Sequence, residues 1–171
     1  MSAQVDYDVL IIGAGSSGSV IASRLSENPN LHIALIEAGP DYADPADTPF
    51  DLINSHNNSY TDHDWGFAYQ PTQHRSDRFP RGRVVGGSSA VNTTIALRGM
   101  PEDYDEWAEV SSDHWSWRNV LPAFKRLERD LDFPDAPYHG DSGPITIRRY
   151  PPAELVPQQQ AFLDSALELD Y

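Results

Sequence analysis

An α/β fold built on a parallel strand–helix–strand unit is predicted by three features of residues 7–37. An apolar and β-branched run, Tyr7–Ile12, ends abruptly at a glycine, as a strand covered on both faces does. The hexapeptide Gly13–Gly18 follows at once, with glycine at its first, third and sixth positions. A second apolar run, Leu31–Ile36, is followed directly by the acidic Glu37. This order is typical of a Rossmann-like nucleotide-binding unit.

Each part of this unit has a physical role toward a dinucleotide. Gly13 allows the tight turn, Gly15 lets a pyrophosphate approach the backbone, and Gly18 lets the helix pack close to the strand. The helix expected at Ser19–Leu25 would turn its free N–H groups and positive dipole end toward the phosphates. Glu37 would accept hydrogen bonds from the adenosine ribose, and its charge disfavours the 2′-phosphate of NADP. The motif alone leaves FAD and NAD open.

Composition narrows the class of protein. The 171 residues suit one domain with a core of its own. Cysteine is absent, which excludes disulfides, thiolate metal sites and a cysteine nucleophile. The net charge of −14 argues against nucleic acid and anionic membrane surfaces as partners. No segment has the length of a signal peptide or a membrane span, so a soluble, cytoplasmic protein is expected.

The stretch after the second strand is polar and less regular. Asp41–Asp64 is expected to be a functional excursion or poorly ordered. His56 and His63 lie there near aspartates, but without a helical spacing they are interpreted as solvated loop histidines, and no metal ligand is predicted. Trp65–Tyr69 alternates aromatic and small residues like a half-buried strand, either in the core or near a flat ligand. The arginines of Arg75–Arg83 would meet phosphates or form surface salt bridges.

A second glycine-rich stretch, Gly82–Ile95, also points to a ligand. Its small residues, Gly86–Ala90, would let backbone amides face a bound group with no side chain in the way. Asn92 and the two threonines after it add neutral donors.

Helical patterns dominate the second half of the chain. Pro101 opens a helix with an acidic first turn, and Ser116 is the expected N-cap of the next one. Ile145–Ile147 is expected to be a short strand and Pro157–Leu169 a final amphipathic helix. The predicted core positions on these helices are Val120, Phe124, Leu127 and Leu131, and then Phe162, Leu163, Ala166 and Leu167.

Gly82–Asp105 resembles the first signature of the glucose–methanol–choline (GMC) flavin oxidoreductases. That signature runs glycine, basic residue, any, aliphatic, two glycines, two small residues, any, aliphatic, Asn, and this chain meets each position. Asp103–Trp107, Trp115–Arg126 and Tyr138–Ile145 are also similar to the family. The resemblance implies FAD as cofactor and a Rossmann-like FAD-binding βαβ core with an irregular flavin-binding extension.

The resemblance also assigns roles by position. The turn glycines would hold the pyrophosphate, Glu37 the ribose, and Val85 with residues 92–95 the isoalloxazine. Some family members tether the flavin through a histidine just before the asparagine; this chain has Val91 there, which predicts a non-covalent FAD. The predicted cofactor-binding residues are Gly13, Ala14, Gly15, Ser16, Ser17, Gly18, Glu37, Ala38, Arg83, Val85, Gly86, Gly87, Asn92, Thr93, Thr94 and Ile95.

Family members oxidise the CH–OH group of an alcohol by hydride transfer to flavin N5, and include choline and alcohol dehydrogenase-like enzymes. Their catalytic histidine lies in a C-terminal part that has no counterpart here, so no catalytic residue is predicted. Only two parallel strands are recognisable, and residues 1–171 are therefore expected to be an incomplete N-terminal FAD-binding domain with the substrate domain largely absent. Turnover would need the missing half, an alcohol and an electron acceptor. The alternatives are an NAD-dependent dehydrogenase domain and a non-catalytic flavoprotein remnant.

Overall fold

The structure is a computed structural model that describes residues 6–54, 59 and 61–170, and it divides into two compact units, Met1–Ile95 and Ala96–Tyr171. In unit 1 the elements are β1 (Val9–Ile12), α1 (Ser16–Leu25), β2 (Ile33–Ile36), η1 (Pro45–Asp47), α2 (Phe50–Ile53), β3 (Ala68–Thr72), β4 (Arg75–Arg78) and α3 (Ser88–Val91). In unit 2 they are α4 (Pro101–Val110), η2 (Asp113–Trp115), α5 (Trp117–Leu127), β5 (Glu128–Asp130), β6 (Ile145–Ile147), η3 (Pro152–Glu154) and α6 (Pro157–Glu168).

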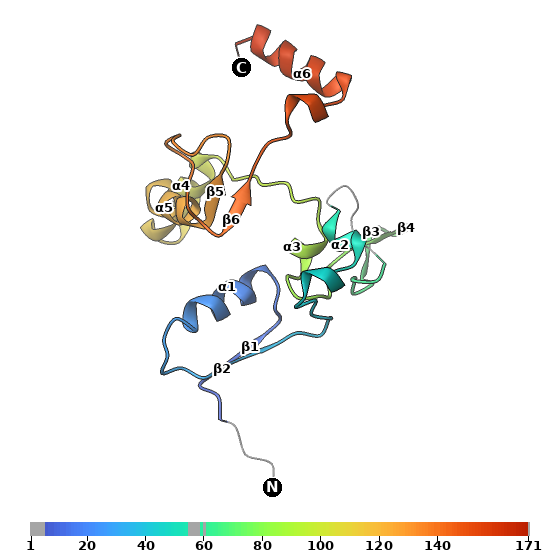
Figure 1. Ribbon diagram of the computed structural model, residues 1–171, viewed down its shortest axis with the longest axis vertical. Helices are drawn as coiled ribbons and strands as arrows, with labels where there is room; N and C mark the ends of the chain where they lie inside the picture. Colours follow the sequence, from blue (N-terminus) through green and yellow to red (C-terminus); the bar gives the residue numbers. More distant parts are fainter. Residues whose placement is uncertain (1–5, 55–58, 60, 171) are drawn as a thin grey trace. The chain divides into compact units, whose positions relative to one another are not determined.

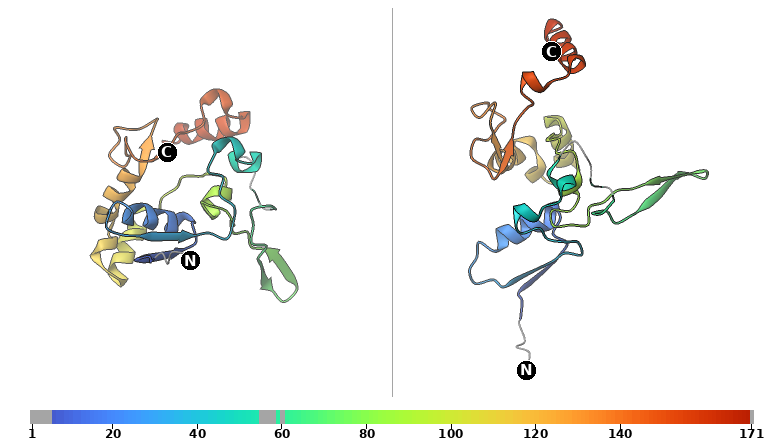
Figure 2. Two further views of the ribbon diagram at one scale, coloured as in Figure 1. Left: turned by 60° about the horizontal axis from the view of Figure 1, so that its bottom comes forward. Right: turned by 45° about the vertical axis from the view of Figure 1, so that its right-hand side comes forward.

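The predicted strand–helix–strand unit is confirmed in unit 1. β1 and β2 pair in parallel, with Val9 opposite Ile33, and α1 packs against the pair (Figures 1 and 2). The helix starts at Ser16, three residues earlier than predicted. β2 starts two residues later than predicted because the N–H of Leu31 is bonded within the turn, to the carbonyl of Asn28.

The prediction of a half-buried strand at Trp65–Tyr69 is wrong. β3 begins at Ala68 and forms an exposed antiparallel hairpin with β4, which extends from the rest of unit 1 (Figure 2). Its partner strand, Arg75–Arg78, is almost wholly charged, so the sequence gives no hydrophobic alternation from which a strand is predicted. The rings of Trp65 and Phe67 stack on each other before the hairpin, with centroids 6.0 Å apart.

Aromatic rings form the packed centre of unit 2. Tyr104 of α4 is buried, and its ring lies 5.6 Å from that of Trp107 and 5.5 Å from those of Trp117 and Phe124. Pro101 opens α4 as predicted. Ser116 holds the predicted N-cap position of α5, but its hydroxyl donates to the carbonyl of Asp113 rather than capping the helix.

Two predicted core stripes are only partly right. α5 ends at Leu127, and the chain turns into strand β5, so Leu127 and Leu131 are exposed while Val120 and Phe124 are half-buried. α6 forms where predicted, but Phe162, Leu163 and Leu167 are exposed rather than inward, and Ala166 is half-buried. None of the helices in the described part of the chain combines the length and hydropathy that crossing a bilayer requires.

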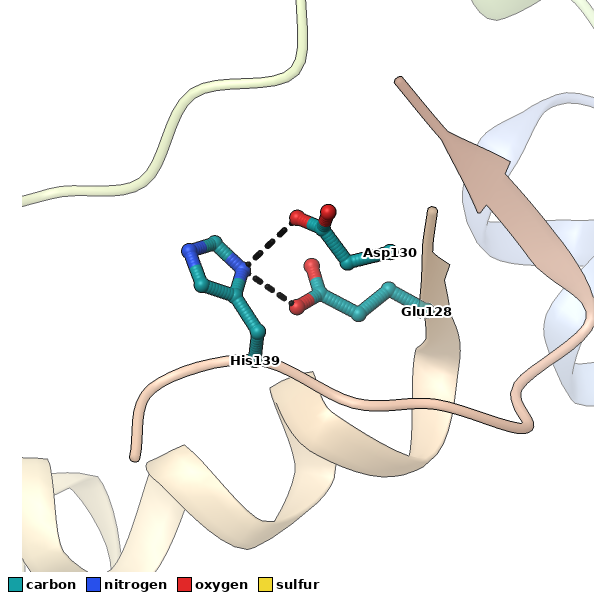
Figure 3. Close-up of side chains that lie close together, drawn as sticks. All are labelled: Glu128, Asp130 and His139. Atoms are coloured by element: carbon teal, nitrogen blue, oxygen red, sulfur yellow. Dashed lines mark hydrogen bonds and ion pairs between the residues drawn. The ribbon is translucent and has the colours of Figure 1, made fainter. Parts of the chain in front are cut away.

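The most highly charged element, β5, holds buried carboxylates. Glu128 and Asp130 are 4% and 1% exposed, and the Nδ1 of His139 lies 2.9 Å from Glu128 Oε1 and 3.0 Å from Asp130 Oδ2 (Figure 3). Arg98 contacts Glu128 at 2.6 Å, and Arg149 pairs with Asp130. Two guanidinium groups therefore balance the two carboxylates, which identifies the cluster as an ion-pair network that fixes β5 and β6 rather than a cation site.

Candidate functional site

The two glycine-rich turns of unit 1 meet directly. The N–H of Gly86 donates to the carbonyl of Ala14 at 2.8 Å, and Gly15 and Gly86 form an isolated parallel bridge. The hydroxyl of Ser16 donates to that of Ser89 at 2.9 Å. Predicted ligand-binding segments that lie far apart in the sequence are thus brought to one place.

Glycine is required where these turns approach each other. A Cβ on Gly87 would lie 2.8 Å from the Cα of Gly15, closer than real Cβ contacts, and Gly87 has a positive φ of 56°. A Cβ on Gly18 would lie 1.9 Å from the carbonyl oxygen of Gly13, so the helix could not pack this close to the turn with any side chain there. The backbone itself therefore forms the walls of the site.

The amino terminus of α1 opens at the same place. Gly15 is its N-cap and supplies no side-chain cap, and the first turn holds no acidic residue. Ser16 and Ser17 in that turn are exposed. Uncapped N–H groups and the positive end of the helix dipole suit a phosphate group.

Glu37 joins the end of β2 to the first turn. Its Oε2 accepts from the N–H of Ala14 at 2.8 Å, and its Oε1 accepts from the N–H of Gly39 at 2.9 Å. Each carboxylate oxygen has a second acceptor site, which leaves the residue able to bind ribose hydroxyls as well. Glu37 therefore shapes the glycine turn, a role that the motif did not predict. Ala38, next to it, is exposed.

The second turn is held by backbone contacts on both sides. The N–H of Arg83 donates to the carbonyl of His63 at 2.8 Å, and the N–H of Val85 donates to that of Pro40 at 3.0 Å. The guanidinium of Arg83 lies 5.9 Å from the ring centre of Trp65. Arg83 and Val85 both remain exposed, as residues that meet a ligand must.

Residues 92–95 form a strained, exposed loop after α3. Thr94 has a φ of +56°, which is rare for a β-branched residue, and its N–H donates to Oδ1 of Asn92 at 2.7 Å. The amide side chain of Asn92 thus holds the loop in shape. Thr93 and Ile95 flank the strained residue and are exposed with it.

The interpretation of His63 as a solvated histidine is wrong. Its side chain is buried, with 3% of the residue exposed, and both ring nitrogens have hydrogen-bond partners. A histidine in a polar loop carries no periodicity from which burial is predicted, so the sequence offered no signal for it. His56 lies outside the described residues.

Comparison with known proteins identifies the family to which this chain belongs. The model of the GMC oxidoreductase family matches residues 7–171. The chain belongs to the GMC oxidoreductase family. Family membership confirms the α/β class predicted from the sequence.

Individual GMC relatives cover nearly the whole chain. It is 34% identical over 166 residues to an alcohol dehydrogenase (acceptor) of Pseudomonas putida, a match with 95% of this chain and 29% of the relative. Pyridoxine 4-oxidase from Mesorbium loti shares 32% identity and a TM-score of 0.81 over 96% of this chain and 32% of its own. A structure concerned with FAD modification in the formate oxidase of Aspergillus oryzae shares 26% identity and a TM-score of 0.71 over 92% and 29%. The chain thus spans about three tenths of the length of these relatives.

Family membership, with flavoproteins among the similar structures, identifies FAD as the cofactor for this GMC chain. The geometry of unit 1 fits that group: two glycine-rich turns in contact, an uncapped helix terminus and an acid at the end of β2. The contact of each named residue with FAD remains a prediction.

Proposed function

We propose that this chain is the FAD-binding part of a GMC oxidoreductase that oxidises the CH–OH group of an alcohol. The observation that carries the proposal is the direct bond between the two turns, from Gly86 N–H to the carbonyl of Ala14. One turn, with the terminus of α1, is suited to the pyrophosphate; the other, with residues 92–95, is suited to the flavin ring. The alcohol named for the Pseudomonas putida relative supports the substrate class.

In the complete enzyme, FAD supplies the acceptor for the hydride that leaves the alcohol carbon. The residues of this chain bind and orient the cofactor. Gly15 keeps the backbone open to the pyrophosphate, while Gly13 makes the turn and Gly18 lets α1 pack against it. Glu37 takes the ribose hydroxyls. Arg83 adds positive charge beside the second turn. No residue of this chain is assigned as the base that takes the proton of the alcohol.

We further propose that the flavin is held without a covalent bond. Val91 stands where some members carry the histidine that attaches the flavin, and a valine side chain has no group that could form such a bond. Val91 is also buried, so it packs rather than faces a ligand. Acid precipitation of the FAD-loaded chain is expected to leave all flavin in the supernatant, and flavin in the protein pellet would refute this part.

FAD binding is tested by titrating the purified chain with FAD, NAD and NADP and following flavin fluorescence or ligand displacement. FAD is expected to bind tightest and NADP weakest, because Glu37 repels a 2′-phosphate. Binding of NAD without FAD would favour an NAD-dependent dehydrogenase domain instead, and binding of no nucleotide would favour a non-catalytic remnant.

The enzymatic part of the proposal needs the rest of the fold. Co-expression with the complementary C-terminal part of a relative is expected to give alcohol-dependent bleaching of the flavin absorption. A soluble, flavin-loaded pair that no alcohol bleaches would contradict it.

A further inference from the structure

Four side chains of the segment between β2 and β3 form a partly buried hydrogen-bonded chain around His63. Its Nδ1 lies 2.9 Å from the hydroxyl of Ser59, and its Nε2 lies 2.8 Å from the hydroxyl of Tyr42. Ser59 also donates to Asp51, whose Oδ2 lies 3.3 Å from Nδ1. Ser59 and His63 are 2% and 3% exposed. This network has no role in the cofactor chemistry described above.

Donors and acceptors match throughout the network when His63 is neutral. Ser59 donates its proton to the carboxylate of Asp51, so its oxygen is free to accept from Nδ1–H of His63. Nε2 then accepts from the hydroxyl of Tyr42. Every buried polar atom of the ring is satisfied, and such fully paired buried networks fix one conformation.

The backbone of His63 is in direct contact with the second glycine turn. Its carbonyl accepts from the N–H of Arg83 at 2.8 Å, and the neighbouring Asp64 forms a bridge with Gly82. On the other side of the turn, the carbonyl of Pro40 accepts from Val85. Tyr42 lies two residues after Pro40 and bonds to the His63 ring, so the network ties both supports of the turn together.

We propose that His63, fixed by Tyr42 and Ser59, is a positioning residue for the flavin site: it holds Arg83 and the second glycine turn where that turn meets the first. This inference rests on the proposed binding of FAD at these turns. Tyr42→Phe is the sharpest test, because it removes one hydroxyl and keeps the ring that contacts His63 edge-on at 5.6 Å. Ser59→Ala removes the closer partner of Nδ1 and leaves only Asp51, whose Oδ2 lies 3.3 Å away.

Amide hydrogen exchange of the chain without FAD measures directly how firmly the second glycine turn is held. Both variants are expected to raise the exchange of the Arg83 and Val85 amides about tenfold, the effect of losing one buried hydrogen bond, and to leave the β1–β2 amides unchanged. FAD affinity should fall by a similar factor. Tyr69→Phe is the matched control, since Tyr69 is exposed on β3 and keeps its ring contact with Phe79 as phenylalanine.

Three results would overturn the inference: unchanged exchange at Arg83 and Val85, faster exchange that extends equally to β1 and β2, or faster exchange with unaltered FAD affinity. A shift of the flavin absorption bands at saturating FAD in Tyr42→Phe, absent in Tyr69→Phe, would support it. A wild-type chain that binds no FAD would refute the proposed function, and the localised exchange would still decide whether the network positions the turn.

Discussion

At the scale of single residues, Gly18 shows how a packing distance decides the effect of a substitution. Alanine favours a helix over glycine by about 1 kcal/mol. A Cβ at Gly18, however, would lie 1.9 Å from the carbonyl oxygen of Gly13. We expect Gly18→Ala to lower the free energy of unfolding by about 2 kcal/mol, because the clash with backbone outweighs the gain in propensity.

Urea denaturation and FAD titration check this prediction together, and FAD affinity should fall at least about tenfold. Ser17→Ala, one residue earlier on the exposed side of α1, is the control and should unfold at the same urea concentration or slightly higher. A Gly18→Ala chain as stable as wild type would show that α1 does not need its close contact with the turn.

Thr94 provides a second prediction at this scale. A threonine at φ +56° is strained, whereas asparagine adopts the left-handed region readily. Thr94→Asn should therefore raise the free energy of unfolding by about 1 kcal/mol, measured by chemical denaturation. Thr93→Asn is the control, since Thr93 is not among the described non-glycine residues with positive φ. Equal changes in both variants would contradict a strained Thr94.

At the scale of elements, the buried carboxylates of β5 make unit 2 sensitive to acid. The hydrogen bond from Arg149, followed by the N–H groups of Phe133 and Asp132, holds the pKa of Asp130 far below its usual range against the opposing effect of burial. Burial also opposes ionisation of Glu128, but Arg98, the N–H of Gly140 and His139 together lower its pKa. Both groups are ionised in the folded chain at neutral pH.

A carboxylate with a lowered folded pKa stabilises the fold fully above its unfolded pKa of about 4, and this contribution is lost as the pH falls below that value. Asp130→Asn should lower the free energy of unfolding by about 2 kcal/mol at neutral pH, since it removes the closer and buried charged partner of Arg149 and leaves only Asp132, 3.6 Å away. The difference from wild type should shrink on going from about pH 6 to about pH 3. Thermal unfolding across this pH range measures this difference in stability, with the exposed Asp135→Asn as control. A difference that does not depend on pH would contradict the lowered pKa of Asp130.

The elements also show what could be predicted from sequence and what could not. The βαβ unit was predictable because its signals, the apolar runs, the glycine spacing and the terminal acid, each depend only on residues that are close together in the sequence. β5 was not, because the residues Glu128–Asp130 are typical of a solvated surface, and only distant partners such as Arg98 and Arg149 make their burial possible. The buried state of His63 likewise depends on Tyr42 and Ser59, and these positions follow no helical or strand repeat from which the contact is predicted. Residue patterns thus revealed the backbone part of the site and missed its polar support.

At the scale of the whole molecule, the chain exposes apolar residues that ordinary soluble domains bury. On β1 and β2 these include Ile12, which is 82% exposed, and also Leu10, Leu35 and Ile36. Exposed apolar surface of this kind binds hydrophobic dyes and promotes association. We expect the chain by itself to enhance ANS fluorescence and to self-associate with rising concentration.

Ile12→Thr combined with Ile36→Thr should reduce both the dye signal and the association, because it replaces two exposed isoleucines that lie opposite each other on the strand pair. Val110→Thr, at the exposed end of α4, is the control and should change neither. Analytical ultracentrifugation and dye titration measure the two effects. A monomeric wild type without dye enhancement would show that these strands are covered in solution.

The contact between the two turns has a consequence for biosynthesis. The hydroxyl bond from Ser16 to Ser89 spans 73 residues, whereas β1, α1 and β2 complete one another within a much shorter stretch. During translation the strand–helix–strand unit can therefore form early, while the first glycine turn lacks its counterpart until the second glycine stretch has left the ribosome. If both turns are needed to bind the cofactor, the nascent polypeptide can bind it only after the second glycine turn has been synthesised.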